Sequence, residues 1–274
     1  MSPASITTPA ATTTTIPTSA RLGMMLTDLR LPTIKRLAGD LCTQSDNEGW
    51  PAHRLLEALL EHEINEREAR RINRHRVESN LSPDKRLSSF DFSAVPSVSK
   101  AQVMALAEGT EWVERGANVL LFGPPGVGKS HLVSALGHAL IDAGRRVLFA
   151  RCSDLVQRLQ VARRDLRLPQ ELAKLDRFDL LILDDLSYVR RDQAETSVLF
   201  ELISERYERK SLAITANTPF SQWGEVFVEP AMTLAAVDRL VHHSTILEMN
   251  VESYRRRAAQ EGHAPPGRKD RTTK

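Results

Sequence analysis

The glycine-rich segment 123–130 has the residue types and the spacing of a phosphate-binding loop. It fits the pattern G-x-x-x-x-G-K-S, follows an apolar run at 118–122, and leads into apolar residues at helical spacing. In this strand–loop–helix context, backbone N–H groups and the positive end of the helix surround phosphate oxygens. The sequence therefore predicts a nucleoside triphosphate site. The residues expected to line it are Gly123, Pro124, Pro125, Gly126, Val127, Gly128, Lys129, Ser130 and His131.

A pair of carboxylates, Asp184 and Asp185, ends the apolar run 180–183. Such a run is typical of a strand buried on both faces, and open α/β folds bind ligands at the carboxyl ends of their strands. We expect Asp184 and the hydroxyl of Ser130 to hold Mg²⁺ beside the phosphates. Asp185 is then placed to orient or deprotonate an attacking water molecule.

Asn217 follows the next predicted strand, 211–216. An amide at this strand end can hydrogen-bond the outer phosphate or the water that attacks it. An Asn before Thr218-Pro219 is also a common turn former. The Phe90–Phe92 segment has two interpretations as well, because it can lie against the nucleotide base or serve as a packing anchor.

Arginines recur at helical spacing in the region after Pro51. Glu63 and Glu66 lie four residues before Arg67 and Arg70, so ion pairs along a solvated helix face are one explanation. Contacts with nucleic-acid phosphates are the other, because arginine geometry suits them. The residues alone favour ion pairs. The stripe consists of Arg67, Arg70, Arg71 and Arg74.

The adjacent His242 and His243 raise the question of a metal site. Neighbours on a helix point about 100° apart, and we see no carboxylate or thiol that completes a ligand set. We therefore expect these two residues to be packing or surface residues.

The elements that must position these side chains alternate between strands and helices. This order predicts an α/β P-loop NTPase core with a parallel five-stranded sheet and helices on both faces. The strands are expected at 118–122, 146–150, 178–183, 211–216 and about 245–249. Other predicted helices include 24–43, a second one after Pro51, 100–115, one capped by Ser153, and 193–209.

The composition is that of an ordinary soluble protein, with 41% hydrophobic and 26% charged residues. Because the net charge is only +2, any basic surface must be local. Cys42 and Cys152 lie far apart, which favours reduced thiols over a disulfide framework. We find no apolar run of about 18–20 residues and no signal-peptide pattern. We expect a cytoplasmic protein with no membrane association.

Taken together, these segments resemble the IstB/DnaC family of AAA+ ATPases (the ASCE class), and most closely the IstB-type helper ATPases of insertion sequences. The resemblance covers roughly residues 25–255 of the chain. It rests on the segments 120–132, 180–186, 217–220 with Trp223, 238–243 and 252–255.

The resemblance implies ATP with Mg²⁺, and an ATP-dependent homo-oligomer in which a neighbour's arginine completes each site. Arg239 stands where that arginine is expected, and Arg255 is a competitor. IstB-like proteins bind duplex DNA non-specifically and regulate or recruit the transposase of their element. The arginine stripe then becomes a set of expected DNA contacts, together with Arg158, Arg163 and Arg164.

Two departures from the family pattern are visible. Asp185 stands where many AAA+ ATPases have Glu, and little chain follows Tyr254, which implies a truncated or absent lid and slow hydrolysis. The alternatives are a DnaC-like loader of the replicative helicase, a small-molecule P-loop kinase, and a nucleotide-dependent scaffold without useful hydrolysis. The predicted parts are a disordered tail (1–20), a helical DNA- or partner-binding domain (21–80), a linker (81–98), the AAA+ ATPase domain (99–255) and a basic disordered tail (256–274).

Overall fold

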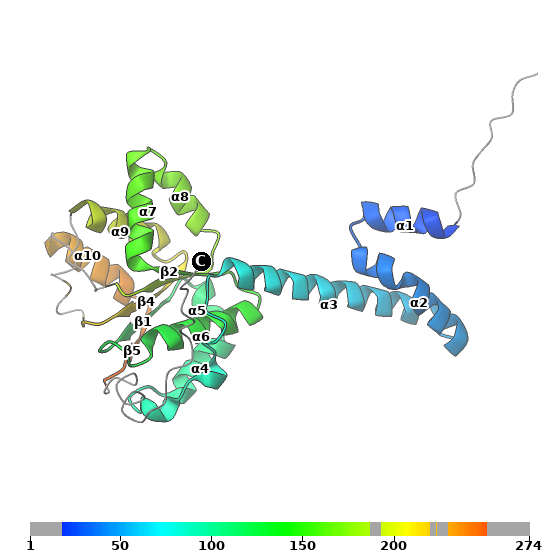
Figure 1. The fold of residues 1–274 in the computed structure, drawn as a ribbon, viewed down its shortest axis with the longest axis horizontal. Helices are drawn as coiled ribbons and strands as arrows, with labels where there is room; N and C mark the ends of the chain where they lie inside the picture. The colour runs from blue at the N-terminus through cyan, green and yellow to red at the C-terminus, as the bar shows by residue number, and fades with distance from the viewer. Residues whose placement is uncertain (1–17, 187–192, 220–222, 224–229, 251–274) are drawn as a thin grey trace, which may run out of the picture. The chain divides into compact units, whose positions relative to one another are not determined.

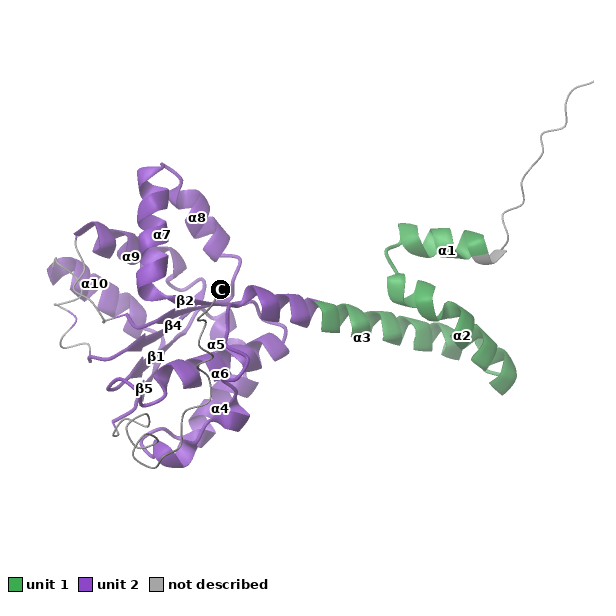
Figure 2. Ribbon diagram, in the orientation of Figure 1, with its two compact units in different colours: residues 1–70 green, residues 71–274 purple. Residues whose placement is uncertain are grey.

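The computed structural model describes residues 18–186, 193–219, 223 and 230–250 (Figure 1). The predicted basic tail and the region of the lid lie outside the described residues, and so do Arg255 and residues 1–17 of the predicted N-terminal tail. Residues 18–20 of that tail form the first turn of a helix. The chain divides into two compact units, residues 1–70 and 71–274 (Figure 2).

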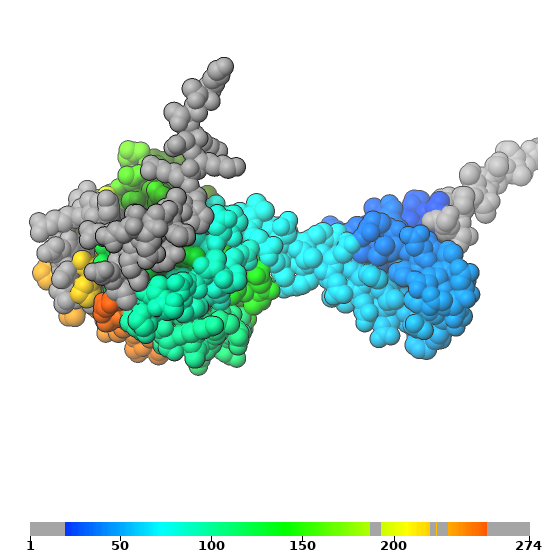
Figure 3. Space-filling view, turned by 60° about the horizontal axis from the view of Figure 1, so that its bottom comes forward, coloured from blue at the N-terminus to red at the C-terminus, as the bar shows by residue number. Residues whose placement is uncertain are grey.

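The first unit is helical. It contains α1 (Thr18–Asp28), α2 (Pro32–Glu48) and the greater part of α3 (Ala52–Glu78). The predicted single helix over 24–43 is wrong, because α1 and α2 are separate and pack on each other (Figure 3). The break has a local cause: Pro32 disfavours a helical conformation at the preceding residue, and Arg30 has a left-handed φ of 57°.

A buried carboxylate joins α3 to α2. Glu63 is only 3% exposed, and its Oε2 accepts hydrogen bonds from the N–H groups of Thr33 (2.8 Å) and Ile34 (3.1 Å) in the first turn of α2. Those groups have no partner within their own helix. Burial alone would raise the pKa of Glu63, but these hydrogen bonds and the nearby Arg67 outweigh it and lower the pKa.

The second unit is built on a parallel five-stranded sheet, as predicted, with the strand order β2-β3-β4-β1-β5. Each strand lies close to its predicted range. The strands are β1 (Asn118–Phe122), β2 (Val147–Arg151), β3 (Leu180–Asp184), β4 (Ser211–Ala216) and β5 (Ser244–Glu248).

Helices cover both faces of this sheet, and alternate strand residues supply the two halves of the core. Leu121 and Ile182 face one group of helices, whereas Leu120 and Leu181 face the other (Figure 1). The first group is α4 (Lys100–Glu108), α5 (Glu111–Glu114) and α6 (Lys129–Asp142). The second group is α7 (Cys152–Arg164), α8 (Leu168–Leu175), α9 (Gln193–Arg206) and α10 (Pro230–Val241).

Two other predicted boundaries need correction. The helix expected over 100–115 is divided into α4 and α5 at Gly109, which caps α4 in an extended conformation. The helix expected after a Ser153 cap begins at Cys152 instead, with Arg151 in the cap position. The predicted linker contains the short 3₁₀ helices η1 (Leu87–Ser89) and η2 (Phe92–Ala94). Its Val95 and Val98 are buried in the same cluster as α4 and α6, so the linker packs as part of the second unit.

Arg206 fixes the amino ends of the strands that carry the site. It is 1% exposed, and its guanidinium donates to the carbonyl oxygens of Leu175, Phe178 and Ser211. Burial lowers the pKa of Arg206 to about 10, so the group stays charged at neutral pH. In the part of the chain that the structure describes, no helix is long and apolar enough to cross a membrane.

Replacing Glu63 with Gln tests the α2–α3 junction. We expect Glu63→Gln to lower the stability of the helical unit at pH 7 by about 1 kcal/mol. The amide oxygen can still accept from the N–H groups of α2, but the negative charge that strengthens those hydrogen bonds and pairs with Arg67 is lost. Because the folded-state pKa is lowered, this contribution is complete above the pKa of an unfolded glutamate, about 4.3, and is lost as the pH falls through the lower folded value.

Thermal unfolding followed by circular dichroism at pH 7 and at pH 3 would measure the effect. The control is Glu61→Gln, an identical change at an exposed position of the same helix. Equal melting temperatures for both variants at pH 7 would show that Glu63 does not cap α2.

Candidate nucleotide-binding site

The sheet order brings the predicted site residues to one edge. Since all five strands are parallel, the carboxyl ends of β1, β4 and β3 lie side by side, with β4 in the middle (Figure 1). The glycine-rich loop follows β1, Asp185 follows β3, and Asn217 follows β4. These are the positions at which open α/β sheets bind ligands.

The loop between β1 and α6 needs its glycines for space as well as for conformation. A Cβ atom on Gly123 would lie 2.5 Å from the carbonyl oxygen of Met249, beside the end of β5. Gly128 has a φ of 102° and ends the loop directly before α6 begins at Lys129. The loop is therefore held close to β5 while the N-terminus of α6 points its N–H groups toward the sheet edge.

The side chain of Lys129 lies across this loop. It is 5% exposed, and its Nζ donates hydrogen bonds to the carbonyl oxygens of Gly123 (2.6 Å) and Pro124 (2.9 Å). The third acceptor is the amide oxygen of Asn217, at 2.8 Å. A buried ammonium group with three oxygen partners can exchange them for phosphate oxygens without leaving its place.

Asp184 is the acceptor at the centre of the site. It is 7% exposed, and its Oδ1 accepts hydrogen bonds from the hydroxyls of Ser130 (2.8 Å) and Thr215 (2.6 Å). A carboxylate and a serine hydroxyl in contact, at the end of a phosphate-binding loop, are the oxygen donors that a hydrated Mg²⁺ ion uses. The donor set therefore fits this metal.

Asp185 has a backbone conformation that is uncommon for a residue other than glycine. It is exposed and has a φ of 60°, in the left-handed region that only a few non-glycine residues adopt. Its backbone N–H donates to the hydroxyl of Thr215 at 2.9 Å, which fixes this turn of the chain.

Thr215 is the site residue that the sequence reasoning missed. Its hydroxyl donates to the carboxylate of Asp184 and accepts from the N–H of Asp185, so one side chain fixes both acidic residues. The residue is fully buried on β4, where a threonine is unremarkable in a strand. A signal was nonetheless present, because a polar residue two positions before Asn217 interrupts the apolar run 212–216.

An aromatic group adjoins the other side of the loop. Phe90 lies edge-on to both Phe92 and His131, with ring centroids 4.9 and 5.3 Å apart, and it approaches Gly128. The ring of His131 also lies 3.1 Å from the carbonyl oxygen of Arg86. Burial lowers the pKa of His131, so the ring is neutral at pH 7. The Phe90–Phe92 segment therefore borders the loop, while two of its residues also pack on the core.

Arg239 lies on α10, where it contacts α9, the residue that follows α9 and its own helix. Its guanidinium is 5.1 Å from the ring centroid of Phe200 and 6.0 Å from that of Tyr207, and it donates to the carbonyl oxygen of Ala235. Among the described residues, no contact joins Arg239 to the glycine-rich loop, and its expected role at a neighbouring subunit's site stays a prediction.

The predicted DNA-contact arginines lie in two groups, one on α3 and one on α7. Arg67 and Arg70 lie 3.3 and 3.4 Å from Glu63 Oε1, so they belong to the junction that caps α2. The expected pair of Glu66 with Arg70 does not form between side chains: Arg70 donates to the backbone oxygen of Glu66, whose carboxylate contacts Arg36. Arg71 and Arg74 follow on the exposed surface of α3.

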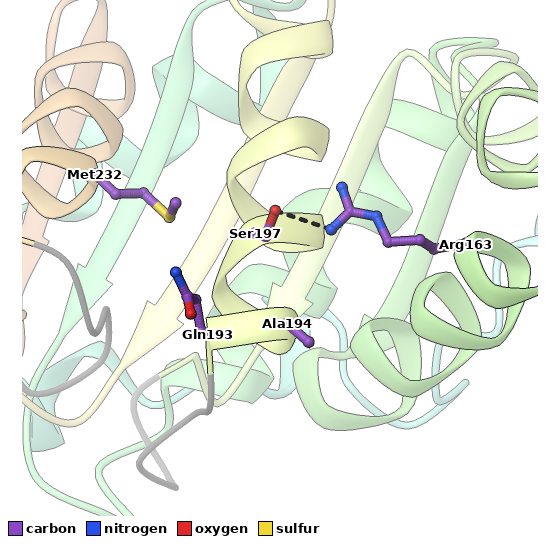
Figure 4. A pocket seen from close by; sticks show the side chains of 5 residues that line it. All are labelled: Arg163, Gln193, Ala194, Ser197 and Met232. Atoms are coloured by element: carbon purple, nitrogen blue, oxygen red, sulfur yellow. Dashed lines mark hydrogen bonds between the residues drawn. The ribbon is translucent and has the colours of Figure 1, made fainter.

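The second arginine group lies on α7. Arg158 pairs with Glu171 at 3.1 Å, Arg164 is exposed near Asp165, and Arg163 pairs with Glu201. Arg163 also donates to Ser197 at 2.9 Å, at the wall of an open pocket of about 530 Å³ (Figure 4). The remaining residues that line this pocket are Gln193, Ala194 and Met232. Arg158 and Arg163 therefore already have acidic partners within the domain.

His242 and His243 do not lie on a helix, contrary to the expectation. α10 ends at Val241, and both rings are exposed in the turn that follows. Their centroids are 4.0 Å apart, and the carboxylate of Glu208 lies beside both. The expectation that no carboxylate completes a set is wrong, because Glu208 is distant in sequence and close in space.

Comparison with known proteins identifies one family. The family model described as IstB-like ATP binding protein matches residues 24–262. An insertion sequence ATP-binding protein of Sinorhizobium fredii is 67% identical over 249 residues, which cover 91% of this chain and 84% of the relative. The ATP-binding protein of insertion sequence IS21 from Pseudomonas aeruginosa is 37% identical over 234 residues, which cover 85% and 88% of the two chains.

Solved structures share the fold. The AMPPCP-bound DnaA of Aquifex aeolicus superposes with a TM-score of 0.52 at 19% identity, covering 67% of this chain and 56% of that one. DnaI superposes with a TM-score of 0.50 at 20% identity, covering 62% and 95%. At such identities the likeness is one of fold, that of a parallel sheet covered by helices on both faces.

The role of Thr215 is open to a direct test. Thr215→Val keeps the shape of the side chain but leaves the N–H of Asp185 without its acceptor and removes a donor from Asp184. We expect the free energy of unfolding to fall by about 1–3 kcal/mol. We also expect ATP to bind more weakly in the presence of Mg²⁺ while binding in EDTA changes little.

Isothermal titration with and without Mg²⁺ would separate the two effects. Thr245→Val, the same substitution on the edge strand β5, is the control. A Thr215→Val protein that binds Mg²⁺–ATP like the unaltered protein would remove Thr215 from the site.

Proposed function

The chain belongs to the family of IstB-like ATP-binding proteins of insertion sequences, and from this premise we propose that it is a DNA-bound ATPase that regulates or recruits a transposase. The observation that carries the proposal is the convergence of Lys129, Ser130, Asp184 and Asn217 at one sheet edge. The family match indicates that the nucleotide is ATP. The arrangement of these residues supports its hydrolysis.

The positions of four side chains at this edge support hydrolysis as the proposed activity. Ser130 and Asp184 would hold Mg²⁺ against the phosphates, where its charge stabilises the charge that develops during phosphoryl transfer. Asp185 would orient the attacking water, and Asn217 would hold the outer phosphate or that water. The shorter reach of Asp185, compared with the glutamate common in AAA+ proteins, supports slow turnover.

We propose that a neighbouring subunit adds a second positive charge to the one that Lys129 brings to the site. Phosphoryl transfer gains greatly from an arginine directed at the transferred group. Arg239 stacks on α9, so we assign it to the site of a neighbouring subunit in an ATP-dependent oligomer. Arg255 lies outside the described residues and stays a competing candidate.

Duplex DNA is the proposed partner, bound with little sequence preference. The exposed arginines of α3 support this, since contacts between arginine and phosphate carry no sequence information. Arg71 and Arg74 are the pair suited to a test, because a change at Arg67 or Arg70 would also disturb the α2 junction.

Two of the alternatives lose support. A small-molecule kinase is disfavoured by the family match over residues 24–262. A helicase loader shares the proposed machinery, but the relatives that match most of the chain are named for insertion sequences. A scaffold without useful hydrolysis is addressed by the mixing experiment that follows.

Mixing two inactive variants tests hydrolysis and the shared site together. Asp185→Asn should lose turnover in its own site but still offer Arg239, whereas Arg239→Ala should lose the arginine but keep a complete Asp185 site. If Arg239 acts on a neighbour, an equal mixture places both intact groups at about a quarter of the interfaces. We expect the mixture to regain ATPase activity, measured as phosphate release.

The matched control mixes Asp185→Asn with Lys129→Ala. Both lesions then lie in the subunit that binds the nucleotide, so every site stays defective and activity should stay absent. A mixture of Asp185→Asn and Arg239→Ala that is as inactive as this control would rule out Arg239 as the shared arginine. Full activity of Asp185→Asn by itself would remove Asp185 from catalysis.

The proposed DNA contacts can be tested through the dependence of binding on salt concentration. We expect Arg71→Ala/Arg74→Ala to weaken binding to duplexes of unrelated sequence equally. The slope of log K against log salt is negative, and its magnitude should decrease by about 1 for each lost phosphate contact. Fluorescence anisotropy with ATP over a range of salt concentrations would measure it.

Arg115→Ala/Arg209→Ala is the control, because both arginines are exposed and the charge change is the same. An unchanged slope for Arg71→Ala/Arg74→Ala, or an equal decrease for both double variants, would contradict the assignment to α3.

A further inference from the structure

Three metal-binding side chains meet on the surface of the second unit, away from the nucleotide loop. They are Glu208, just after α9, and His242 and His243, between α10 and β5. Their ligand atoms all lie within 4.8 Å of one another. We propose that these three residues form a binding site for a divalent transition-metal ion of the zinc class. The proposal does not depend on the ATPase activity.

The distances suit a single ion. Glu208 Oε1 lies 3.5 Å from His242 Nδ1 and 3.6 Å from His243 Nε2. With Zn–N and Zn–O bonds of about 2.0–2.2 Å, two ligands of a tetrahedral ion are about 3.3–3.5 Å apart. The carboxylate oxygen therefore already stands at nearly the spacing that a shared ion requires from each imidazole.

The backbone holds the three side chains in these positions. Glu208 has a φ of 56°, and this left-handed turn directs the chain from α9 toward β4. β5 begins at Ser244 and pairs with β1, while the N–H of Asn118 donates to the carbonyl oxygen of His243 at 2.7 Å. The ligands thus come from two turns that the sheet and α9 fix separately.

Tyr207 adds a group that can support bound metal. Its hydroxyl lies 2.7 Å from His242 Nδ1, and the next residue along the chain is Glu208. When Nδ1 ligates the ion, the hydroxyl can donate to Glu208 instead, and such outer hydrogen bonds orient metal ligands. A neutral imidazole pair with one carboxylate selects Zn²⁺, Ni²⁺ or Co²⁺ over the oxygen-seeking Mg²⁺.

Bound metal would join α9 to the end of α10. Arg239 is three residues before His242 on the chain and stacks on Phe200 and Tyr207, both near this turn. An ion held by Glu208, His242 and His243 would connect the turn after α9 to the turn after α10. Arg239 lies on α10, just before the second of these turns. The site therefore has the character of a structural ion at the surface.

Zinc titration of the untagged, nucleotide-free full chain tests the proposal. We expect one equivalent of Zn²⁺ to bind by isothermal titration, and Co²⁺ to give a visible absorption band of a nitrogen-ligated site. His242→Asn/His243→Asn should abolish that equivalent, and Glu208→Gln should weaken it by at least about tenfold. All three positions are exposed, so circular dichroism of the variants should match that of the unaltered protein.

The chain has eight histidines, so the control is a second histidine pair. His53→Asn/His62→Asn changes two exposed histidines of α3 and should keep the zinc equivalent. Three results would overturn the proposal: no zinc binding by the unaltered chain, equal binding after His242→Asn/His243→Asn, or equal loss in both double variants.

Discussion

The hydrogen bonds to Asp184 are the contacts on which the rest of the candidate nucleotide-binding site depends. One oxygen, Oδ1, accepts from Ser130 at the start of α6 and from Thr215 on β4. These donors are 54 and 31 residues away in sequence, so only the parallel sheet can bring them together. Because the carboxylate is nearly buried, the loss of either donor costs more than a surface hydrogen bond would.

Lys129 balances that buried negative charge from the other side of the loop. Its ammonium group is bonded to three oxygens, one of them on Asn217, so the tip of β4 is joined to the loop after β1. The same strand thus fixes the anion through Thr215 and the cation through Asn217. A triphosphate at this edge has only to exchange the oxygens around Lys129.

The sequence was sufficient for the sheet and the loop, because apolar runs followed by glycine or carboxylate residues have few other structural interpretations. It was insufficient where local pattern and chain geometry compete. The periodicity over 24–43 continues through Leu31, yet Pro32 ends one helix and begins another. Thr215 and Glu208 were missed for a different reason, because each acts on residues distant in the chain. The local sign at Thr215, a polar residue near the end of an apolar strand, does not identify the acidic residue that it contacts.

The contacts that Arg239 makes within its own subunit do not exclude a role in the site of a neighbouring subunit. A stacked guanidinium at 5.1 Å from Phe200 is held by about 0.5–1 kcal/mol when partly exposed. An arginine that completes a phosphoryl-transfer site is worth about 10³–10⁵ in rate, or about 4–7 kcal/mol. In the proposed oligomer, the arginine therefore gives up a small stabilisation on α9 for a larger one at the phosphate of a neighbour.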